Sequence, residues 1–182
     1  MQSDDLIQQW IELYYDRLTY IAYTYLHDRS AAEDSVQEAL VKAYVSQRDL
    51  NDPSRPYPWL VRIVIHECLN RLRKQRRELP SEILPEQGGA STEDVYMTRS
   101  RNREVYSAVM SLQEKFRTPV LLYYFEELSV KEIAFALNMG QGAVKTRLLR
   151  GRAQLREKLE EGEHRDELGE PYSGGKTGLY PR

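Results

Sequence analysis

Residues 129–150 read SVKEIAFALNMGQGAVKTRLLR, a stretch that carries the start and stop signals of two consecutive helices. Ser129 is followed three residues later by Glu132, a capping box that marks the start of a helix. Asn138-Met-Gly140 ends that helix, because asparagine tolerates the left-handed backbone that a tight turn between helices needs. A second helix is expected from about Gln141. The stretch therefore predicts two short helices that cross closely, the arrangement of a helix-turn-helix.

The second helix of this motif is predicted to have an apolar side and a basic side. The apolar side consists of Val144, Leu148, Gly151 and Leu155. The residues that point outward near its start, or flank that face, are Gly142, Lys145, Thr146, Arg147 and Arg150. Arginine and lysine side chains contact phosphates and the guanine edge in the major groove. This face therefore predicts a DNA-recognition helix.

The composition of the whole chain predicts a soluble protein. The chain has 182 residues, a net charge of -2, 41% hydrophobic residues and 30% charged residues. No run approaches the roughly 20 apolar residues of a membrane span, so no membrane insertion is expected. The amino terminus lacks the basic and apolar regions of a signal peptide, which predicts a cytoplasmic location. The single cysteine, Cys68, allows no internal disulfide and offers no second thiol for a zinc site.

The apolar periodicity predicts an all-α protein of two small helical domains joined by a flexible linker. The first domain is expected over 1–78, and the second, which contains the helix-turn-helix, over 103–160. Between them, 79–102 loses the periodicity and gathers proline, glycine and serine, as linkers do. The glycine-rich segment 161–182 is predicted to be a disordered tail.

Charge is distributed unevenly between these parts. Residues 1–58 are acidic, whereas 62–77 and 141–158 are strongly basic. Two separated basic blocks indicate two contacts with a polyanion, although each block taken singly also fits a solvated helix face.

Three helices are expected in the first domain. The apolar face of the first helix consists of Leu6 or Ile7, Trp10, Tyr14, Leu18, Ile21 and Tyr25. The second helix is predicted to open at Ser30 with a capping box to Glu33. Its core face is predicted as Val36, Leu40, Ala43 and Tyr44, and its opposite face as Asp34, Gln37, Glu38 and Val41. This opposite face is an acidic, amide-bearing strip that faces solvent or a partner.

The third helix, after Pro58, carries a polar and basic ridge opposite its apolar side. The apolar side is Leu60, Val64, Cys68 and Leu72, and the ridge is Arg62, His66, Asn70, Arg73 and Arg77, with Arg76 beside it. Arginine neutralises phosphates, and Asn or His can bond base edges, so the ridge suits a nucleic-acid groove. For His66, metal ligation is disfavoured because no nearby His or paired Cys accompanies it. A pH switch and an ordinary hydrogen-bonding residue remain open.

The order of these motifs resembles the sigma factors of bacterial RNA polymerase, specifically their extracytoplasmic-function (ECF) group. The residues that carry the resemblance are Ala32 to Glu38, Trp59 to Ile63, Arg71 to Arg77, Glu132 to Ala134 and Val144 to Arg147. The resemblance covers residues 1 to about 160. It departs from the family pattern at His66, where Asn is usual, and at Asn70, where Asp is common.

The resemblance implies a partner for each predicted surface. The strip of Asp34, Gln37, Glu38 and Val41 would dock on the clamp helices of core RNA polymerase. The ridge would engage the minus-ten element of promoter DNA, duplex and melted, and Tyr57 before it could stack on a flipped base. The recognition helix would enter the major groove at the minus-thirty-five element. The linker would thread the polymerase cleft, and an anti-sigma factor is a further partner.

The sequence thus predicts an alternative sigma factor without catalytic chemistry, cofactor or metal. No serine-histidine-acid set, metal cluster or complete phosphate-binding loop is present in it. Two other functions remain as alternative hypotheses. A stand-alone helix-turn-helix regulator would bind its operator without polymerase, and a sigma-like adaptor would keep the fold without binding promoters.

Overall fold

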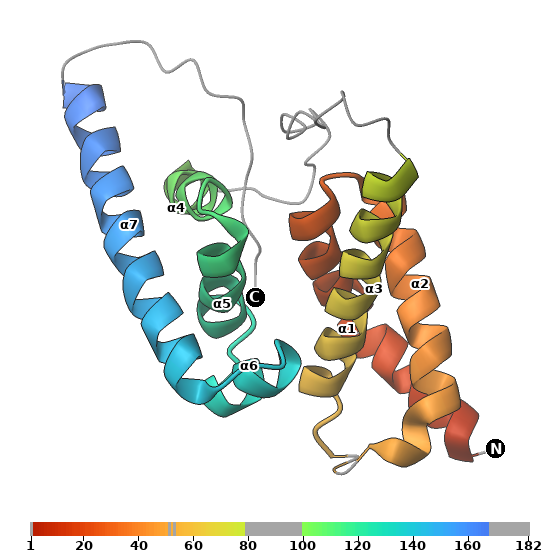
Figure 1. Ribbon diagram of the computed structural model, residues 1–182. Helices are drawn as coiled ribbons and strands as arrows, with labels where there is room; N and C mark the ends of the chain where they lie inside the picture. The colour runs from red at the N-terminus through yellow and green to blue at the C-terminus, as the bar shows by residue number, and fades with distance from the viewer. Residues whose placement is uncertain (1, 51, 53, 79–99, 168–182) are drawn as a thin grey trace. The chain divides into compact units, whose positions relative to one another are not determined.

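The computed structural model describes residues 2–50, 52, 54–78 and 100–167, which form no strand (Figure 1). The helices are α1 (Gln2–Leu26), α2 (Arg29–Ser46), the 3-10 turn Gln47–Asp49, α3 (Tyr57–Glu78), α4 (Ser100–Met110), α5 (Glu114–Tyr124), α6 (Val130–Ala136) and α7 (Gln141–Glu167). The predicted all-α class is confirmed. Contacts divide the chain into two compact units, one of residues 1–88 with 131–139 and one of residues 89–130 with 140–182.

In the first unit, α1, α2 and α3 pack against one another in pairs (Figure 1). The apolar residues spaced by three and four along α1 meet in the core, as predicted from their periodicity. Leu18 and Ile21 of α1 are fully buried, and Leu60, Val64 and Cys68 of α3 are almost completely buried. This three-helix core holds the outward faces of α2 and α3 in fixed positions.

The start of α2 differs from the predicted capping box. Asp28, not Ser30, is the N-cap: its backbone is extended and its Oδ1 accepts a 2.6 Å hydrogen bond from the Ala31 N–H. The residue before it, His27, has a φ of 53°. This left-handed residue reverses the chain after α1, and the helix begins early enough to include Ser30.

The core face of α2 is mostly as predicted. Val36 and Ala43 are fully buried and Leu40 is nearly so, whereas Tyr44 is 46% exposed. The buried stripe continues through alanines, including Ala32 and Ala39. Because these small residues let α2 lie close to its neighbours, the bulky Tyr44 ring at the edge of the stripe projects to solvent.

In the second unit, α5 and α7 approach so closely that a glycine is required at one point. A Cβ placed on Gly151 of α7 would lie 2.7 Å from Cγ2 of Val120 and 3.5 Å from the Phe116 carbonyl oxygen. Val144 and Leu148, on the same side of α7, are also buried. The predicted apolar side of this helix is therefore confirmed at these three positions, and Leu155 is half-buried.

The turn between α6 and α7 has the predicted chemistry. Ser129 directly precedes α6, and Asn138 adopts a φ of 51°, the left-handed conformation expected there. α7 begins at Gln141 as predicted but continues to Glu167, into the segment predicted to be disordered. Residues 161–167 include three glutamates and Arg165, residue types that favour helix. The remaining residues of the predicted tail, and most of the predicted linker, lie outside the described residues.

Candidate nucleic-acid interface

The predicted strip on α2 is exposed. Asp34, Gln37, Glu38 and Val41 all face outward. One turn beyond Val41, Val45 extends the same face and is 76% exposed. Val45 was not among the residues predicted for the strip, although its spacing of four from Val41 places it on the same helix face. The face therefore combines carboxylates at one end with exposed apolar groups at the other.

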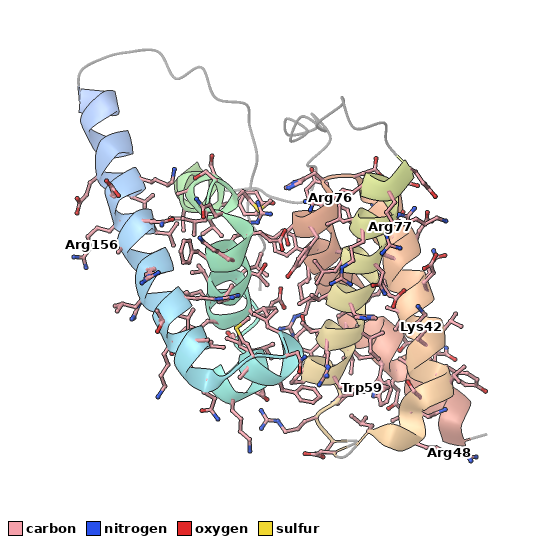
Figure 2. All side chains as sticks on the ribbon, in the orientation of Figure 1. Lys42, Arg48, Trp59, Arg76, Arg77 and Arg156 are labelled. Atoms are coloured by element: carbon pink, nitrogen blue, oxygen red, sulfur yellow. The ribbon has the colours of Figure 1, made fainter. Side chains whose placement is uncertain are left out.

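The ridge on α3 is ordered by hydrogen bonds between its own side chains. Asn70 Nδ2 lies 3.2 Å from His66 Nδ1, and the Asn70 Oδ1 accepts a 3.1 Å bond from Arg73 Nη1. Arg62 is half-buried at the start of the ridge. Arg76 and Arg77 are exposed at its end, where their side chains leave the last turn of α3 (Figure 2). The structure thus joins three of the predicted ridge residues, His66, Asn70 and Arg73, into one row.

A buried acid that was not among the predicted site residues, Glu67, lies beside this row. The Glu67 side chain is 7% exposed, and its Oε2 accepts a 2.5 Å bond from Lys42 Nζ of α2. Its other oxygen lies 3.5 Å from His66 Nδ1. A buried carboxylate requires such partners, because an unpaired charge is costly to remove from water. The signal in the sequence was an acid next to the apolar positions Val64 and Cys68.

Tyr57 is not on the ridge surface. It is 7% exposed, its ring centroid lies 4.8 Å from that of Tyr14, and the Arg17 guanidinium lies 4.2 Å over it. Because these contacts bury the ring, Tyr57 is not exposed to stack on a base as predicted, and it is left out of the DNA surface proposed below. The burial has a local cause, because Tyr57 is the first residue of α3 and turns back onto α1.

Two other residues of α3 belong to the core rather than to the site. Trp59 packs edge-on against Trp10, with ring centroids 6.1 Å apart, and is half-buried. Burial raises the pKa of Cys68 to about 12, and the neighbouring Glu67 carboxylate adds to this shift. The thiol is therefore protonated at neutral pH and poorly reactive.

The predicted recognition face of α7 is exposed in the second unit. Gly142, Lys145, Thr146 and Arg150 are exposed, and Arg147 is half-buried. The Thr146 hydroxyl donates a 3.0 Å bond to the Gly142 carbonyl oxygen. Lys145 and Arg150 therefore present charge at the beginning of a helix whose opposite side is fixed by Val144 and Leu148.

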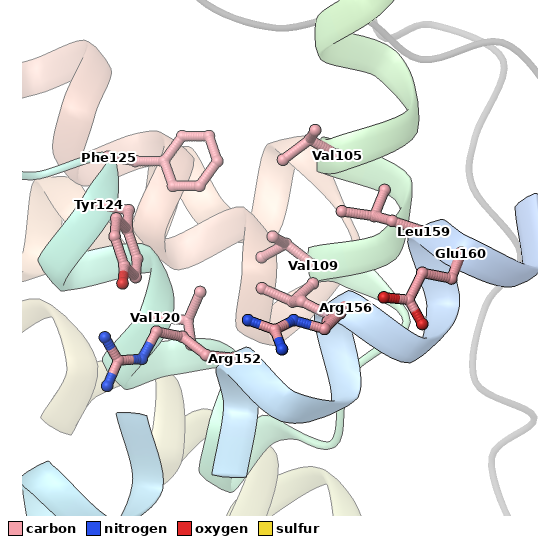
Figure 3. A pocket seen from close by; sticks show the side chains of 10 residues that line it. Val105, Val109, Val120, Tyr124, Phe125, Arg152, Arg156, Leu159 and Glu160 are labelled. Carbon is pink, nitrogen blue, oxygen red and sulfur yellow. The ribbon is translucent and has the colours of Figure 1, made fainter. Parts of the chain in front are cut away.

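An open apolar pocket lies in the second unit, apart from this recognition face (Figure 3). Its volume is about 480 Å³. The side chains that line it come from α4, α5, the residue after α5, and the later part of α7: Val105, Val109, Val120, Tyr124, Phe125, Arg152, Leu155, Arg156, Leu159 and Glu160. Val105 and Tyr124, which border this pocket, are 39% and 49% exposed.

Within the described residues, no helix has the length and apolar character to cross a membrane. The same part of the chain holds no cluster of three or more His, Cys, Asp or Glu side chains suited to a metal ion.

Comparison with known proteins identifies two parts of the chain. The family models described as Sigma-70 region 2 and Sigma-70, region 4 match residues 10–78 and 102–155. The ECF RNA polymerase sigma factor SigW of Bacillus subtilis is 30% identical over 169 residues, which cover 86% of this chain and 90% of that protein. The ECF RNA polymerase sigma-E factor of Escherichia coli K12 is 30% identical, and the match covers 70% of this chain and 73% of that protein.

Solved structures give the same result. The sigma factor RpoE of Bartonella quintana, in co-crystals with the anti-sigma factor NepR, has a TM-score of 0.64 and 25% identity, with coverage of 84% of this chain and 96% of that chain. CnrH, in complex with the cytosolic domain of CnrY, has the same fold at a TM-score of 0.58 and 22% identity. The chain therefore belongs to the sigma-70 family. Within that family its relatives place it in the ECF group, so the predicted family is confirmed.

Proposed function

We propose that this chain is an alternative sigma factor that binds core RNA polymerase through the α2 strip and directs initiation at its own promoters. One observation carries the proposal: the acidic strip of α2 and the basic ridge of α3 lie outward on two helices that pack together in one unit. A protein partner that offers cations can bind the first face while DNA binds the second.

We assign the promoter contacts to the two basic surfaces. The ridge residues Arg62, His66, Asn70, Arg73, Arg76 and Arg77 would engage the minus-ten element. The face of Gly142, Lys145, Thr146, Arg147 and Arg150 would engage the minus-thirty-five element. The weakly negative net charge of -2 supports DNA binding that depends on polymerase, because such a chain binds duplex DNA poorly until polymerase holds it in place.

The chain would contribute binding energy rather than catalysis. Promoter opening would be favoured because the melted strand gains contacts with the ridge, while polymerase supplies the chemistry of RNA synthesis. A sigma factor with these partners would act in the cytoplasm, where bacterial polymerase and DNA lie. An anti-sigma factor is a further partner of this proposal, and its support is the likeness to RpoE, which was crystallised with the anti-sigma factor NepR.

In vitro transcription from a promoter library, with core polymerase in the presence and absence of this chain, tests the proposal. We expect new start sites only when the chain is added. The paired substitutions Asp34→Arg and Glu38→Arg should weaken co-purification with polymerase and abolish those starts. Glu33→Arg offers a matched control, because Glu33 lies beside the strip and pairs with Arg29 of its own helix at 2.8 Å.

The same experiment separates the other two functions. A stand-alone regulator would bind specific DNA equally well without polymerase. A sigma-like adaptor would co-purify with polymerase and leave the start sites unchanged. Either result would refute the proposed function.

A further inference from the structure

Arg71 belongs to the basic run of α3, but its side chain faces α2 rather than the ridge. Its Nη2 lies 3.2 Å from Asp34 Oδ2, and its Nη1 donates to the Ser35 Oγ at 3.4 Å. The Arg71 side chain is only 32% exposed, whereas that of Asp34 is 54% exposed. The cation is therefore sheltered between two helices, and the carboxylate that neutralises it is open to solvent.

The carboxylate of Asp34 takes part in two surfaces at once. It belongs to the exposed strip of α2 that we assign to polymerase. It is also the acid that pairs with Arg71 of α3, and within the described residues Asp34 makes no second ion pair. A cation on a partner that binds the strip would share this carboxylate with Arg71 and weaken the attraction between Asp34 and Arg71.

The neighbouring arginines of α3 are in a different situation. Arg73 bonds the neutral Asn70, and no carboxylate in the described part of the chain lies within ion-pair distance of Arg76 or Arg77. Arg71 thus differs from them because an acid of the strip masks its charge. Loss of that acid would add one positive charge beside the ridge.

We propose that the Asp34–Arg71 ion pair couples the two binding surfaces of the first unit. In the free chain, Asp34 masks Arg71. When a polymerase cation takes the Asp34 carboxylate, the Arg71 guanidinium becomes available to a DNA phosphate beside Arg73. The coupling is reciprocal, because each ligand raises the affinity for the other by the same factor. This inference deepens the proposed function and rests on it.

The free chain gives the first test, with binding to a labelled mixed-sequence DNA duplex measured by fluorescence anisotropy over a series of salt concentrations. Asp34→Asn should raise the affinity about two- to five-fold, the range of an exposed ion pair. The slope of log affinity against log salt concentration should become steeper by about 0.9 for one additional phosphate contact. Arg71→Gln should remove this gain when it is combined with Asp34→Asn.

The control for net charge is Glu33→Gln, because it removes the same charge one residue away and disrupts only the pair with Arg29. This variant should change the affinity less than Asp34→Asn does. If the two variants raise the affinity equally, the gain comes from net charge and the coupling is refuted. If Arg71→Gln folds poorly, Arg71→Lys combined with Asp34→Asn keeps the cation and should keep the gain in affinity; loss of the gain in this variant would contradict the coupling.

The second test compares the Arg71→Gln chain alone and in its complex with core polymerase. The substitution should reduce DNA binding by the complex about two- to five-fold and leave binding by the free chain nearly unchanged. An equal loss in both states would overturn the coupling while leaving the proposed function intact. Failure of the proposed function has another signature, because the wild-type chain would then not alter DNA binding by polymerase at all.

Discussion

Replacing Gly151 by alanine tests the closest contact between helices in the second unit. The added Cβ would lie 2.7 Å from Cγ2 of Val120, well inside the normal contact distance. Val120 is 1% exposed, and a valine in a helix has essentially one allowed rotamer, so its Cγ2 cannot rotate away from the added Cβ at low cost. Helices α5 and α7 must therefore move apart.

Two opposing effects set the size of the loss. Overpacking by one methyl group in a dense core costs about 1–3 kcal/mol. Alanine recovers about 1 kcal/mol because it favours helix more than glycine does. We therefore expect Gly151→Ala to destabilise the second unit by about 1 kcal/mol. Gly142→Ala, in the same helix, has nothing within 4 Å of the added Cβ and should stabilise by up to about 1 kcal/mol.

Urea unfolding of the full chain can separate the two units. Both tryptophans, Trp10 and Trp59, lie in the first unit, so their fluorescence follows that unit, whereas far-ultraviolet circular dichroism follows all helices. Gly151→Ala should lower the dichroism midpoint and leave the fluorescence midpoint unchanged. If Gly151→Ala and Gly142→Ala shift stability in the same direction, the reasoning from the close contact is wrong.

Further outcomes are expected at both DNA surfaces and at the thiol. Arg73→Glu with Arg77→Glu should abolish promoter opening, measured by permanganate footprinting, and leave co-purification with polymerase intact; loss of both would contradict the separation of the α2 and α3 faces. Arg150→Ala should cost about 1–3 kcal/mol at one promoter position if it reads a guanine, and an equal loss on every sequence would show a phosphate contact instead. Because its pKa is raised to about 12, Cys68 should react with a thiol reagent at mildly alkaline pH only when denaturant unfolds the chain; fast reaction of the native chain would contradict its burial.

Features that depend on a short stretch of sequence could be predicted. The turn at Asn138 and the start of α7 followed from local backbone chemistry, and the exposed strip of α2 followed from helical spacing. These features need no knowledge of the neighbouring helices.

Features that depend on packing could not be predicted in this way. Tyr57 looked available for a base because it precedes a basic helix, but contact with Tyr14 and Arg17 of α1 buries it. Tyr44 was expected in the core, but alanines form much of the buried face of α2 and the Tyr44 ring lies at its edge, 46% exposed. Glu67 looked like an ordinary helix acid until Lys42 of another helix provided its partner.

The choice between Asp28 and Ser30 at the start of α2 shows a third limit. Both residue types cap helices well, so sequence alone could not rank them. In the structure, the left-handed backbone of His27 is followed by Asp28 in the extended conformation that a cap requires, and Asp28 is the N-cap.

The row of hydrogen bonds from His66 through Asn70 to Arg73 also affects the entropy of binding. Long side chains lose rotational freedom when they meet a ligand, at a cost of about 0.5–1.5 kcal/mol each. Arg73 has already lost part of this freedom, because Asn70 holds its guanidinium in the folded chain. The position of the Arg73 cation is therefore partly set before any nucleic acid arrives, and this part of the ridge acts as a preformed template rather than as a flexible arm.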